Sequence, residues 1–292
     1  KINLYLGVHT ERDDRGYHRV DSLMAAVGLS DTVTVAPAQA LTVQTIPTSD
    51  FPMQKNTAYR AALAMAEHYG REANICVTIE KRIPLCAGLG GPSTDAAAVI
   101  VALAELWGID RTDPALDDIA RGIGADVPFF LHASLAFYVG GGDVLATEYP
   151  ALLATPVVLV KPREASVSTI EAYRRFDEAP VPADKPGAIA SALHAGDAEM
   201  AYALIHNNLG VISAQMEPQI QMVLDWLRKQ DGTVAVDVCG SGACSFAICD
   251  TAATAERLAD TALQNGWWSC ATELIPNTVR IEGLISDLNR TH

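Results

Sequence analysis

A glycine-rich stretch between residues 84 and 97 has the residue types and spacing most suited to chemistry. It reads Pro84-Leu-Cys-Ala-Gly-Leu-Gly-Gly-Pro-Ser-Thr-Asp-Ala-Ala97. Glycines let the backbone approach a phosphate closely, and the free N–H groups and dipole of a helix N-terminus favour its negative charge. Ser93 and Thr94 add hydroxyl donors there. The stretch therefore predicts an anion site, although a plain glycine-rich connection before a capped helix would have the same pattern.

The loop differs from the two commonest phosphate motifs. A Walker A loop requires Gly-Lys-Ser/Thr, and a dinucleotide fingerprint requires a third glycine where Ser93 stands. The flanking elements are clearer. Residues Ile75–Glu80 alternate in polarity, which predicts a strand. An Ala/Val/Leu-rich segment from about Ala96 to Trp107 predicts a helix that ends at Gly108. These elements would place the glycines at a helix N-terminus.

The rest of the chain mixes helix and strand patterns without strict alternation, which favours an α+β fold in two halves over a doubly wound sheet. Prolines near residue 150 mark a boundary, so we expect one domain over residues 1–150 and another over 151–292. Further helices are predicted at Asn56–Tyr69, Pro114–Arg121, Gly187–His194, Asp197–His206, Pro218–Lys229 and Ala252–Asn265. The last strand is predicted near Thr278–Glu282.

Composition limits the classes of function. The chain has 292 residues, 49% hydrophobic and 19% charged, which is typical of a soluble globular protein. Its longest apolar run, Ala96–Ala104, is too short to span a bilayer. The net charge of −14 disfavours nonspecific binding to nucleic acid or anionic membranes. Six cysteines without a CxxC pair indicate reduced, buried thiols. We therefore expect a cytoplasmic protein with no nucleic-acid, membrane or obligate protein partner.

Several separated segments carry a family resemblance. The loop from Pro84 to Ala97 resembles the phosphate loop of the GHMP kinases, which include the homoserine and mevalonate kinases. Lys1-Ile-Asn-Leu-Tyr-Leu and Gly16-Tyr-His18 are similar to one subfamily, the 4-diphosphocytidyl-2-C-methyl-D-erythritol kinases. Gly124-Ala-Asp-Val-Pro128 and Gly240-Ser-Gly-Ala-Cys244 match the same subfamily in order and spacing. The resemblance covers nearly the whole chain.

The resemblance implies a fold and a reaction. The fold is the two-domain α+β GHMP kinase fold, with a ribosomal protein S5 domain 2-like N-terminal domain and a ferredoxin-like C-terminal domain. The reaction is phosphoryl transfer from ATP, with Mg²⁺, to a hydroxyl of a cytidine diphosphate-linked methylerythritol in the non-mevalonate isoprenoid pathway. The alternatives are another GHMP kinase of the homoserine or mevalonate type, and a non-catalytic nucleotide-binding protein of the same fold.

The resemblance also implies residue roles, each with a structural alternative. Asp126 would be the base that takes the hydroxyl proton, and Lys1 the cation beside it. Asp126 could instead be a turn residue, and Lys1 an exposed strand-end lysine. The ATP phosphates would lie on Pro84, Gly88, Leu89, Gly90, Gly91, Ser93 and Thr94. Ser93 is a candidate Mg²⁺ contact, while the remaining metal ligands stay unknown.

The substrate-binding residues follow in the same way. Tyr17 would stack on the cytosine ring, His18 would hydrogen-bond the base, and Tyr173 would cover the ring's other face. Tyr173 could equally pack in the core. Asn3 would reach the substrate from the first strand, and Thr169 its ribose or phosphate side. Gly240, Ser241 and Gly242 would form a second backbone clamp, although a tight turn would use the same glycines.

Pro92 is the main departure from the family pattern, which normally has glycine at this position. Cys86 and Ala87 also replace usual glycines. Proline is tolerated in the first helical turn but removes one N–H from the phosphate loop. We therefore expect weaker or altered binding of the ATP phosphates.

Overall fold

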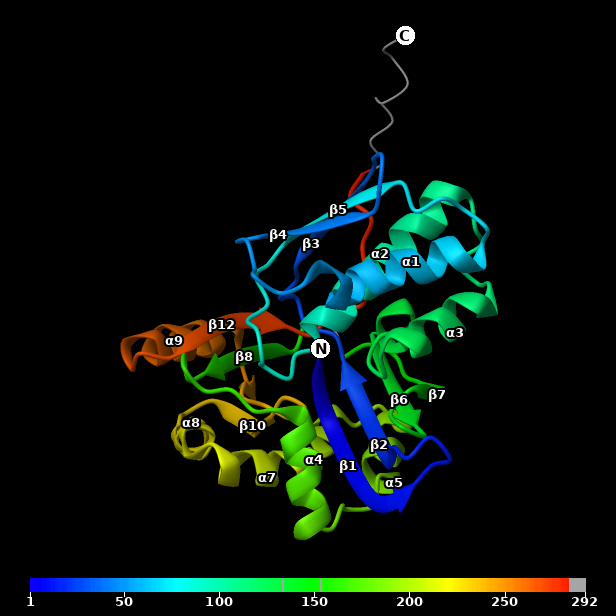
Figure 1. The fold of residues 1–292 in the computed structure, drawn as a ribbon. Helices are drawn as coiled ribbons and strands as arrows, with labels where there is room; N and C mark the ends of the chain where they lie inside the picture. Colours follow the sequence, from blue (N-terminus) through cyan, green and yellow to red (C-terminus); the bar gives the residue numbers. More distant parts are fainter. Residues whose placement is uncertain (133, 153, 284–292) are drawn as a thin grey trace.

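The computed structural model describes residues 1–132, 134–152 and 154–283, and its strands form three sheets (Figure 1). The five-stranded sheet has the order β7-β6-β2-β1-β9, with β1 (Ile2–Arg12), β2 (His18–Ala25), β6 (Leu135–Val139), β7 (Val144–Glu148) and β9 (His206–Asn207). The three-stranded sheet has the order β3-β5-β4, with β3 (Thr32–Pro37), β4 (Thr42–Ile46) and β5 (Ile75–Glu80). The four-stranded sheet has the order β10-β11-β8-β12, with β8 (Pro156–Lys161), β10 (Thr233–Val238), β11 (Ser245–Cys249) and β12 (Trp268–Glu273).

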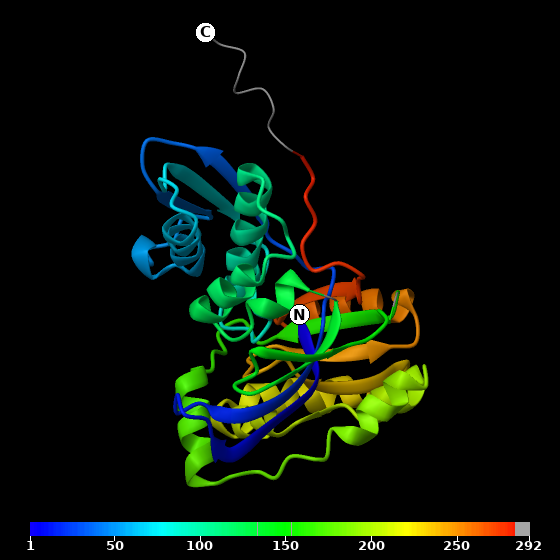
Figure 2. The same ribbon diagram turned by 90° about the vertical axis from the view of Figure 1, so that its right-hand side faces the viewer.

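Three helices lie beside the three-stranded sheet, the first two in contact with its strands and the third packed against those two helices. They are α1 (Thr57–His68), α2 (Gly91–Trp107) and α3 (Pro114–Ile123). Small residues such as Ala61 and Ala97 let α1 and α2 lie close together in this core. The side chain of Asn56 caps α1, and Gly108 in the left-handed conformation ends α2. Figure 2 shows these helices and their sheet standing above the two larger sheets.

The four-stranded sheet has the strand order of a ferredoxin-like fold, as the resemblance implied. Two helices, α8 (Pro218–Arg228) and α9 (Ala252–Gln264), cover one face through Leu227 and Leu258. The other face places Leu159 and Phe246 in a core shared with Leu4 of β1. The α+β organisation expected from the sequence is therefore confirmed.

The two halves of the chain share one sheet. Strand β9, which lies beyond residue 151, pairs in parallel with β1 through Tyr5–His206 and Leu6–Asn207. The remaining helices connect the sheets: α4 (Thr169–Glu178), α5 (Gly187–His194), α6 (Ala198–Ala203), α7 (Asn208–Met216) and the 3₁₀ turns η1 (Met53–Lys55) and η2 (Pro128–Leu131). The helix predicted over Asp197–His206 was too long, because α6 ends at Ala203 and the chain then enters β9.

The last strand was placed wrongly from the sequence. Residues Thr278–Glu282 are not in a strand, and the last strand of the described chain is β12, about ten residues earlier. Residues 268–272 of β12 are all partly buried, so this strand lacks the alternation of buried and exposed side chains by which a strand is recognised. Thr278 instead donates a hydrogen bond of 2.8 Å to the carbonyl oxygen of Phe130.

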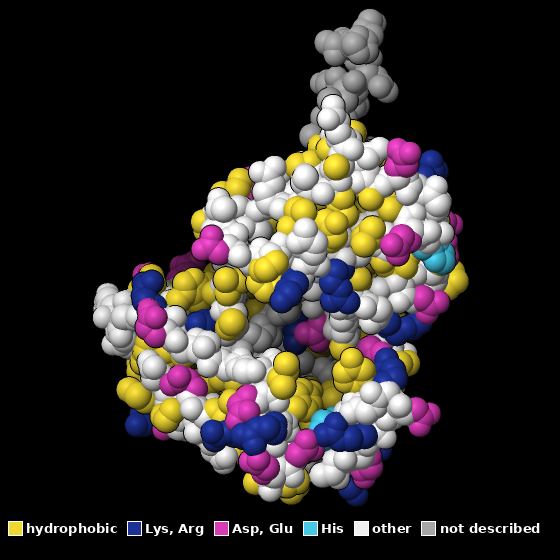
Figure 3. All heavy atoms as spheres, viewed as in Figure 1, with side chains coloured by type: hydrophobic (Ala, Val, Ile, Leu, Met, Phe, Trp, Pro, Cys, Tyr) yellow, Lys and Arg dark blue, Asp and Glu magenta, His cyan; other side chains and the backbone are white. Residues whose placement is uncertain are grey.

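The face of the molecule that is viewed in Figure 1 has a hollow. Figure 3 shows it in the middle of that face, with charged side chains on its wall, where Figure 1 marks the N-terminus. Among the described residues, no helix combines the length and apolar character needed to cross a bilayer.

Candidate active site

The first glycine loop, defined as residues 84–90, connects β5 to α2. Gly88 and Gly90 have φ angles of +73° and +75°, which favour glycine over any other residue. Helix α2 begins at Gly91 and not near Ala96 as predicted, so Gly91, Ser93 and Thr94 belong to its first turn. The sequence prediction was late because Ser, Thr and Pro are weak helix formers that nevertheless suit a first turn.

Pro92 occupies this first turn without disturbing the helix. The N–H groups of Ser93 and Thr94 both donate to the Gly90 carbonyl oxygen, at 3.0 Å and 2.9 Å. The Pro92 carbonyl accepts a hydrogen bond of 2.5 Å from the Thr57 hydroxyl. Since Pro92 has no N–H, the amide of Gly91 is the one in this turn that has no acceptor within the described chain. The turn therefore offers fewer donors to a phosphate than a glycine at position 92 would allow.

The second glycine loop, defined as residues 239–244, lies against the first. The N–H of Ala243 donates to the Cys86 carbonyl at 3.1 Å, and the N–H of Cys244 donates to that of Ala87 at 3.2 Å. A Cβ atom on Gly88 would lie only 1.8 Å from the Cys239 carbonyl oxygen. The two loops thus form one backbone assembly, although about 150 residues separate them in the sequence.

Lys1 and Asp126 meet beside this assembly. The Lys1 Nζ lies 3.3 Å from Asp126 Oδ2 and donates a hydrogen bond of 2.8 Å to Asn3 Oδ1. Lys1 is buried, at 7% exposure, so it is not the exposed strand-end lysine of the alternative interpretation. The Asp126 side chain is 37% exposed, so the carboxylate remains open to a ligand.

Both glycine loops approach the Lys1 side chain. A Cβ atom on Gly90 would lie 3.3 Å from Lys1 Cε, and one on Gly240 would lie 3.5 Å from Lys1 Nζ. The main-chain nitrogen of Lys1 also donates to the Leu89 carbonyl at 3.0 Å. The structure therefore brings together a cation, a carboxylate and two backbone loops. In phosphoryl transfer, cations and backbone N–H groups stabilise negative charge, and a carboxylate can accept the hydroxyl proton.

A second charged group lies behind the first glycine loop and was missed by the sequence analysis. Lys81 pairs with Asp31 and donates a hydrogen bond of 2.7 Å to Asp95 in the first turns of α2. Burial raises the pKa of Asp95, and the Lys81 ammonium opposes this shift. Asp31 Oδ1 also accepts the N–H of Ile83 at 2.8 Å. This group ties the strand before the loop to the helix after it.

Two of the three residues expected to bind cytosine, His18 and Tyr173, lie against each other. His18 is buried, at 5% exposure, and stacks on Tyr173 with ring centroids 5.4 Å apart. Its Nδ1 donates to the His9 carbonyl at 2.7 Å, and its Nε2 lies 3.1 Å from Asp177 Oδ1. Tyr17 is 61% exposed, and the Arg15 guanidinium lies over its ring at 5.2 Å. Tyr173 thus has His18 as its stacking partner.

Thr169 connects this region to the second glycine loop. Its Oγ1 lies 2.8 Å from the Oγ of Ser241, and Thr169 is the first residue of α4, the helix that carries Tyr173. Burial raises the pKa of Tyr173 to about 12, so its ring remains an uncharged phenol at neutral pH. The Asn3 amide is also buried and donates to the Ser22 hydroxyl at 2.9 Å.

The cysteines are all free, as expected, but not all buried. Cys86 is exposed in the first glycine loop, with a φ angle of +50°. The prediction of buried thiols was therefore wrong for this residue, because a loop that presents its backbone to a ligand also exposes its side chains.

Two family models match the chain. Residues 56–134 match the model of the GHMP kinases N terminal domain, and residues 189–266 match that of the GHMP kinases C terminal domain. The chain is 35% identical over 268 residues to the 4-diphosphocytidyl-2-C-methyl-D-erythritol kinase of Mycobacterium avium, covering 87% of this chain and 82% of that relative. It is 36% identical over 260 residues to the kinase of the same name from Desulfitobacterium hafniense, covering 89% and 88%.

Solved structures show the same likeness. A crystal structure of 4-(cytidine 5'-diphospho)-2C-methyl-D-erythritol kinase superimposes with a TM-score of 0.75 at 32% identity, covering 94% of this chain and 96% of that one. The mevalonate kinase of Methanococcus jannaschii gives a TM-score of 0.70 at 13% identity, with the same coverage. At that identity the second match shows the fold alone.

Proposed function

The chain belongs to the GHMP kinases, within the family of the 4-diphosphocytidyl-2-C-methyl-D-erythritol kinases, and on that premise we propose its substrate and the roles of its residues. The substrate is 4-diphosphocytidyl-2-C-methyl-D-erythritol, which receives the γ-phosphoryl group of ATP on a hydroxyl. The observation that carries this proposal is the Lys1–Asp126 pair, 3.3 Å apart, beside two glycine loops that are hydrogen-bonded to each other.

Asp126 is the group that receives the proton. As the substrate hydroxyl oxygen forms its bond to the γ-phosphorus, the bond from that phosphorus to the bridging oxygen breaks and ADP leaves. The hydroxyl proton passes to the Asp126 carboxylate, which is partly open to a ligand. Lys1, held by Asn3, balances the negative charge that spreads over the transferred group. The reaction therefore uses the cation and the carboxylate as a unit.

The ATP phosphates lie on the first glycine loop and the first turn of α2. The proposed contacts are Pro84, Gly88, Leu89, Gly90, Gly91, Ser93 and Thr94. The Ser93 hydroxyl makes no hydrogen bond within the described chain, so it fits the role of a magnesium ligand. Mg²⁺, when bound with ATP, would neutralise part of the phosphate charge.

The cytidine end of the substrate lies toward His18 and Tyr173, with Tyr17 stacking on the cytosine ring. The exposure of Tyr17 supports this, because an exposed aromatic ring is free to reorient onto a ligand. Thr169 contacts the ribose or phosphate side of the substrate, and Gly240, Ser241 and Gly242 form a second backbone clamp near the transferred phosphate. We further propose that residues 1–150 and 151–292 are the two domains, with the site between them.

A coupled assay of ADP release tests the proposal. We expect turnover with 4-diphosphocytidyl-2-C-methyl-D-erythritol and none with homoserine or mevalonate. Asp126→Asn should lower kcat by about 10²- to 10⁴-fold because it removes the proton acceptor. Asp118→Asn is the matched control, since Asp118 is an exposed carboxylate on the neighbouring helix α3. Turnover of only another alcohol would indicate a different GHMP kinase, and ATP binding without any turnover would indicate a non-catalytic protein.

A further inference from the structure

Asn207 is a buried side chain at the point where the two halves of the chain meet. It is 4% exposed, it belongs to strand β9 beside β1, and it caps helix α7. Its Oδ1 accepts the N–H of Gly210 at 2.8 Å. Its Nδ2 donates to two carbonyl oxygens, that of Val238 at 2.9 Å and that of Gly240 at 2.8 Å. Every hydrogen-bonding position of this amide except one acceptor lone pair is therefore in use.

The two carbonyls that accept hydrogen bonds from Asn207 lie at the start of the second glycine loop. Val238 directly precedes the loop, and Gly240 is its second residue. Ser213 holds the next one, because its hydroxyl donates to the Ser241 carbonyl at 2.9 Å. A trans peptide unit points its N–H away from its carbonyl oxygen. Fixing the Gly240 carbonyl toward Asn207 therefore turns the N–H of Ser241 to the opposite side, and this N–H has no acceptor within the described chain.

The Ser241 amide is held close to the reacting groups. A Cβ atom on Gly240, the preceding residue, would lie 3.5 Å from both Lys1 Nζ and Asn3 Oδ1. A backbone N–H fixed beside a lysine at a phosphoryl-transfer site is a donor that needs no rearrangement when charge develops. We propose that Asn207 is a positioning residue that orients the Ser241 N–H toward the transferred phosphate. This inference rests on the proposed function and extends it.

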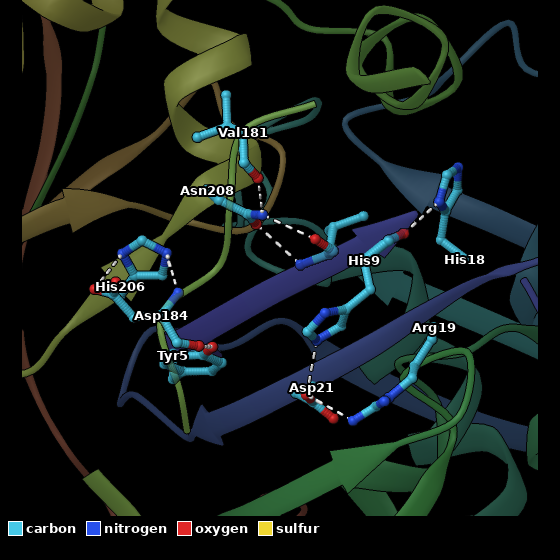
Figure 4. Close-up of polar contacts among 10 residues, drawn as sticks. Tyr5, His9, His18, Arg19, Asp21, Val181, Asp184, His206 and Asn208 are labelled. Atoms are coloured by element: carbon cyan, nitrogen blue, oxygen red, sulfur yellow. Dashed lines mark hydrogen bonds and ion pairs between the residues drawn. The ribbon is translucent and has the colours of Figure 1, made fainter. Parts of the chain in front are cut away.

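Asn208 provides a matched control in the next position. It is fully buried, its Nδ2 donates to the carbonyls of Val8 at 2.9 Å and Val181 at 2.8 Å, and its Oδ1 accepts the N–H of Val8 at 2.9 Å. Figure 4 shows the Asn208 side chain directed at Val181. The two asparagines thus make the same number of hydrogen bonds, but only Asn207 contacts the second glycine loop.

The test replaces each asparagine by its isosteric acid. Asn207→Asp keeps the acceptor that caps α7 but sets an oxygen against the Val238 and Gly240 carbonyls, so the loop loses its support. We expect kcat to fall by about ten- to a hundred-fold, with the KM for ATP changed by less than about threefold. Asn208→Asp should leave kcat within about threefold of the original protein. An unchanged kcat in Asn207→Asp, or an equal fall in both variants, would overturn the proposal.

A second measurement does not depend on activity. Amide hydrogen exchange over residues 239–244 reports the loop hydrogen bonds from Gly242, Ala243 and Cys244. Exchange should be faster in Asn207→Asp and unchanged in Asn208→Asp, and the same exchange in both variants would contradict the proposal. If the original protein does not phosphorylate the cytidine substrate, the proposed function fails while this measurement still decides whether Asn207 holds the loop. If the acids do not fold, Asn207→Ser and Asn208→Ser remove the same donors without adding charge.

Discussion

The two glycine loops lie against each other but are held in place by different means. The first is set by local structure, since β5 leads into it, α2 follows directly, and Gly88 and Gly90 supply the required left-handed conformations. The second is set by distant side chains, because Asn207 and Ser213 hold its carbonyl oxygens from helix α7 and the strand before it. The first loop is therefore recognisable in the sequence by its place between a predicted strand and a predicted helix, whereas the second is recognisable only through the family resemblance.

This difference concerns what fixes the backbone N–H and carbonyl groups of each loop. A helix N-terminus provides donors and a favourable field wherever it occurs, so the first loop needs little outside support. A short loop between two strands has no such field, and the hydrogen bonds from Asn207 and Ser213 add to the two that the second loop makes within itself. The second loop therefore depends on the packing of the C-terminal half, and its contribution should be lost more easily.

The largest expected effect comes from filling the contact between the loops. In Gly88→Ala the new Cβ would lie 1.8 Å from the Cys239 carbonyl, a backbone atom that cannot yield without separating the loops. We expect a loss of stability of several kcal/mol and a KM for ATP at least about tenfold higher. Urea unfolding and ADP-release kinetics measure these effects.

Gly242→Ala is the matched comparison within the second loop. Its nearest neighbours would be side-chain atoms of Ile220 at 3.3 Å and Val238 at 3.4 Å, which can shift. The left-handed φ of +82° then costs about 1–2 kcal/mol. If Gly242→Ala were as damaging as Gly88→Ala, the contact between Gly88 and the Cys239 carbonyl would not be the reason for the larger effect expected of Gly88→Ala.

A smaller expected effect is a pH dependence of stability that arises beside the second loop. Asp237 lies on β10, just before the second loop, and burial raises its pKa to about 7. A carboxyl group whose pKa is higher in the folded protein stabilises the fold at low pH, and this contribution is lost as the pH rises from about 4 to about 7. Asp237→Asn should therefore gain stability relative to the original protein at pH 8 but not at pH 4.

Urea unfolding across this pH range provides the measurement. Asp225→Asn is the control, since Asp225 is a half-exposed carboxylate on α8 that pairs with Arg228, whose charge also opposes the rise in the pKa of Asp237. We expect a gain of about 1–3 kcal/mol at pH 8 for Asp237→Asn, and less than about 0.5 kcal/mol for the control. If the free energy of unfolding depended on pH in the same way for Asp237→Asn and the original protein, the titration of Asp237 would not contribute to stability.

The smallest effect concerns the first loop. Pro92→Gly restores an N–H in the first turn of α2, where Gly91 is otherwise the remaining donor. One hydrogen bond to a charged phosphate contributes about 1.5 kcal/mol, so the KM for ATP should fall by up to about tenfold. An unchanged KM would mean that this position does not face the phosphates.

The sequence allowed most helices to be predicted, and the failures have physical reasons. Helix α5 was predicted with its observed bounds, and β5 as well, because both show regular patterns between clear end signals. Strand β12 was missed because it is uniformly half-buried between a helix and β8. Helix α7 was missed because its start depends on the Asn207 cap and on the pairing of β9 with β1.

Some residues of the candidate site could likewise be found from the sequence, and others could not. Asp126 and Lys1 came from the family resemblance, and the structure places them 3.3 Å apart. Asn207 and the Lys81–Asp95 pair gave no such signal. A buried asparagine that holds a loop and one that caps a helix look alike in a sequence, and a lysine between two aspartates is visible only once β5 and α2 are packed.

The sequence by itself determined that this protein has a glycine loop before a helix, an α+β fold and membership of a kinase family, because glycine spacing and hydrophobic periodicity are local properties of the chain. Only the tertiary structure decided that the second loop rests on the first, that Lys1 is buried beside Asp126, and that Asn207 turns a peptide unit at the site. These features depend on hydrogen bonds between residues up to about 150 positions apart, which leave no periodic pattern in the sequence.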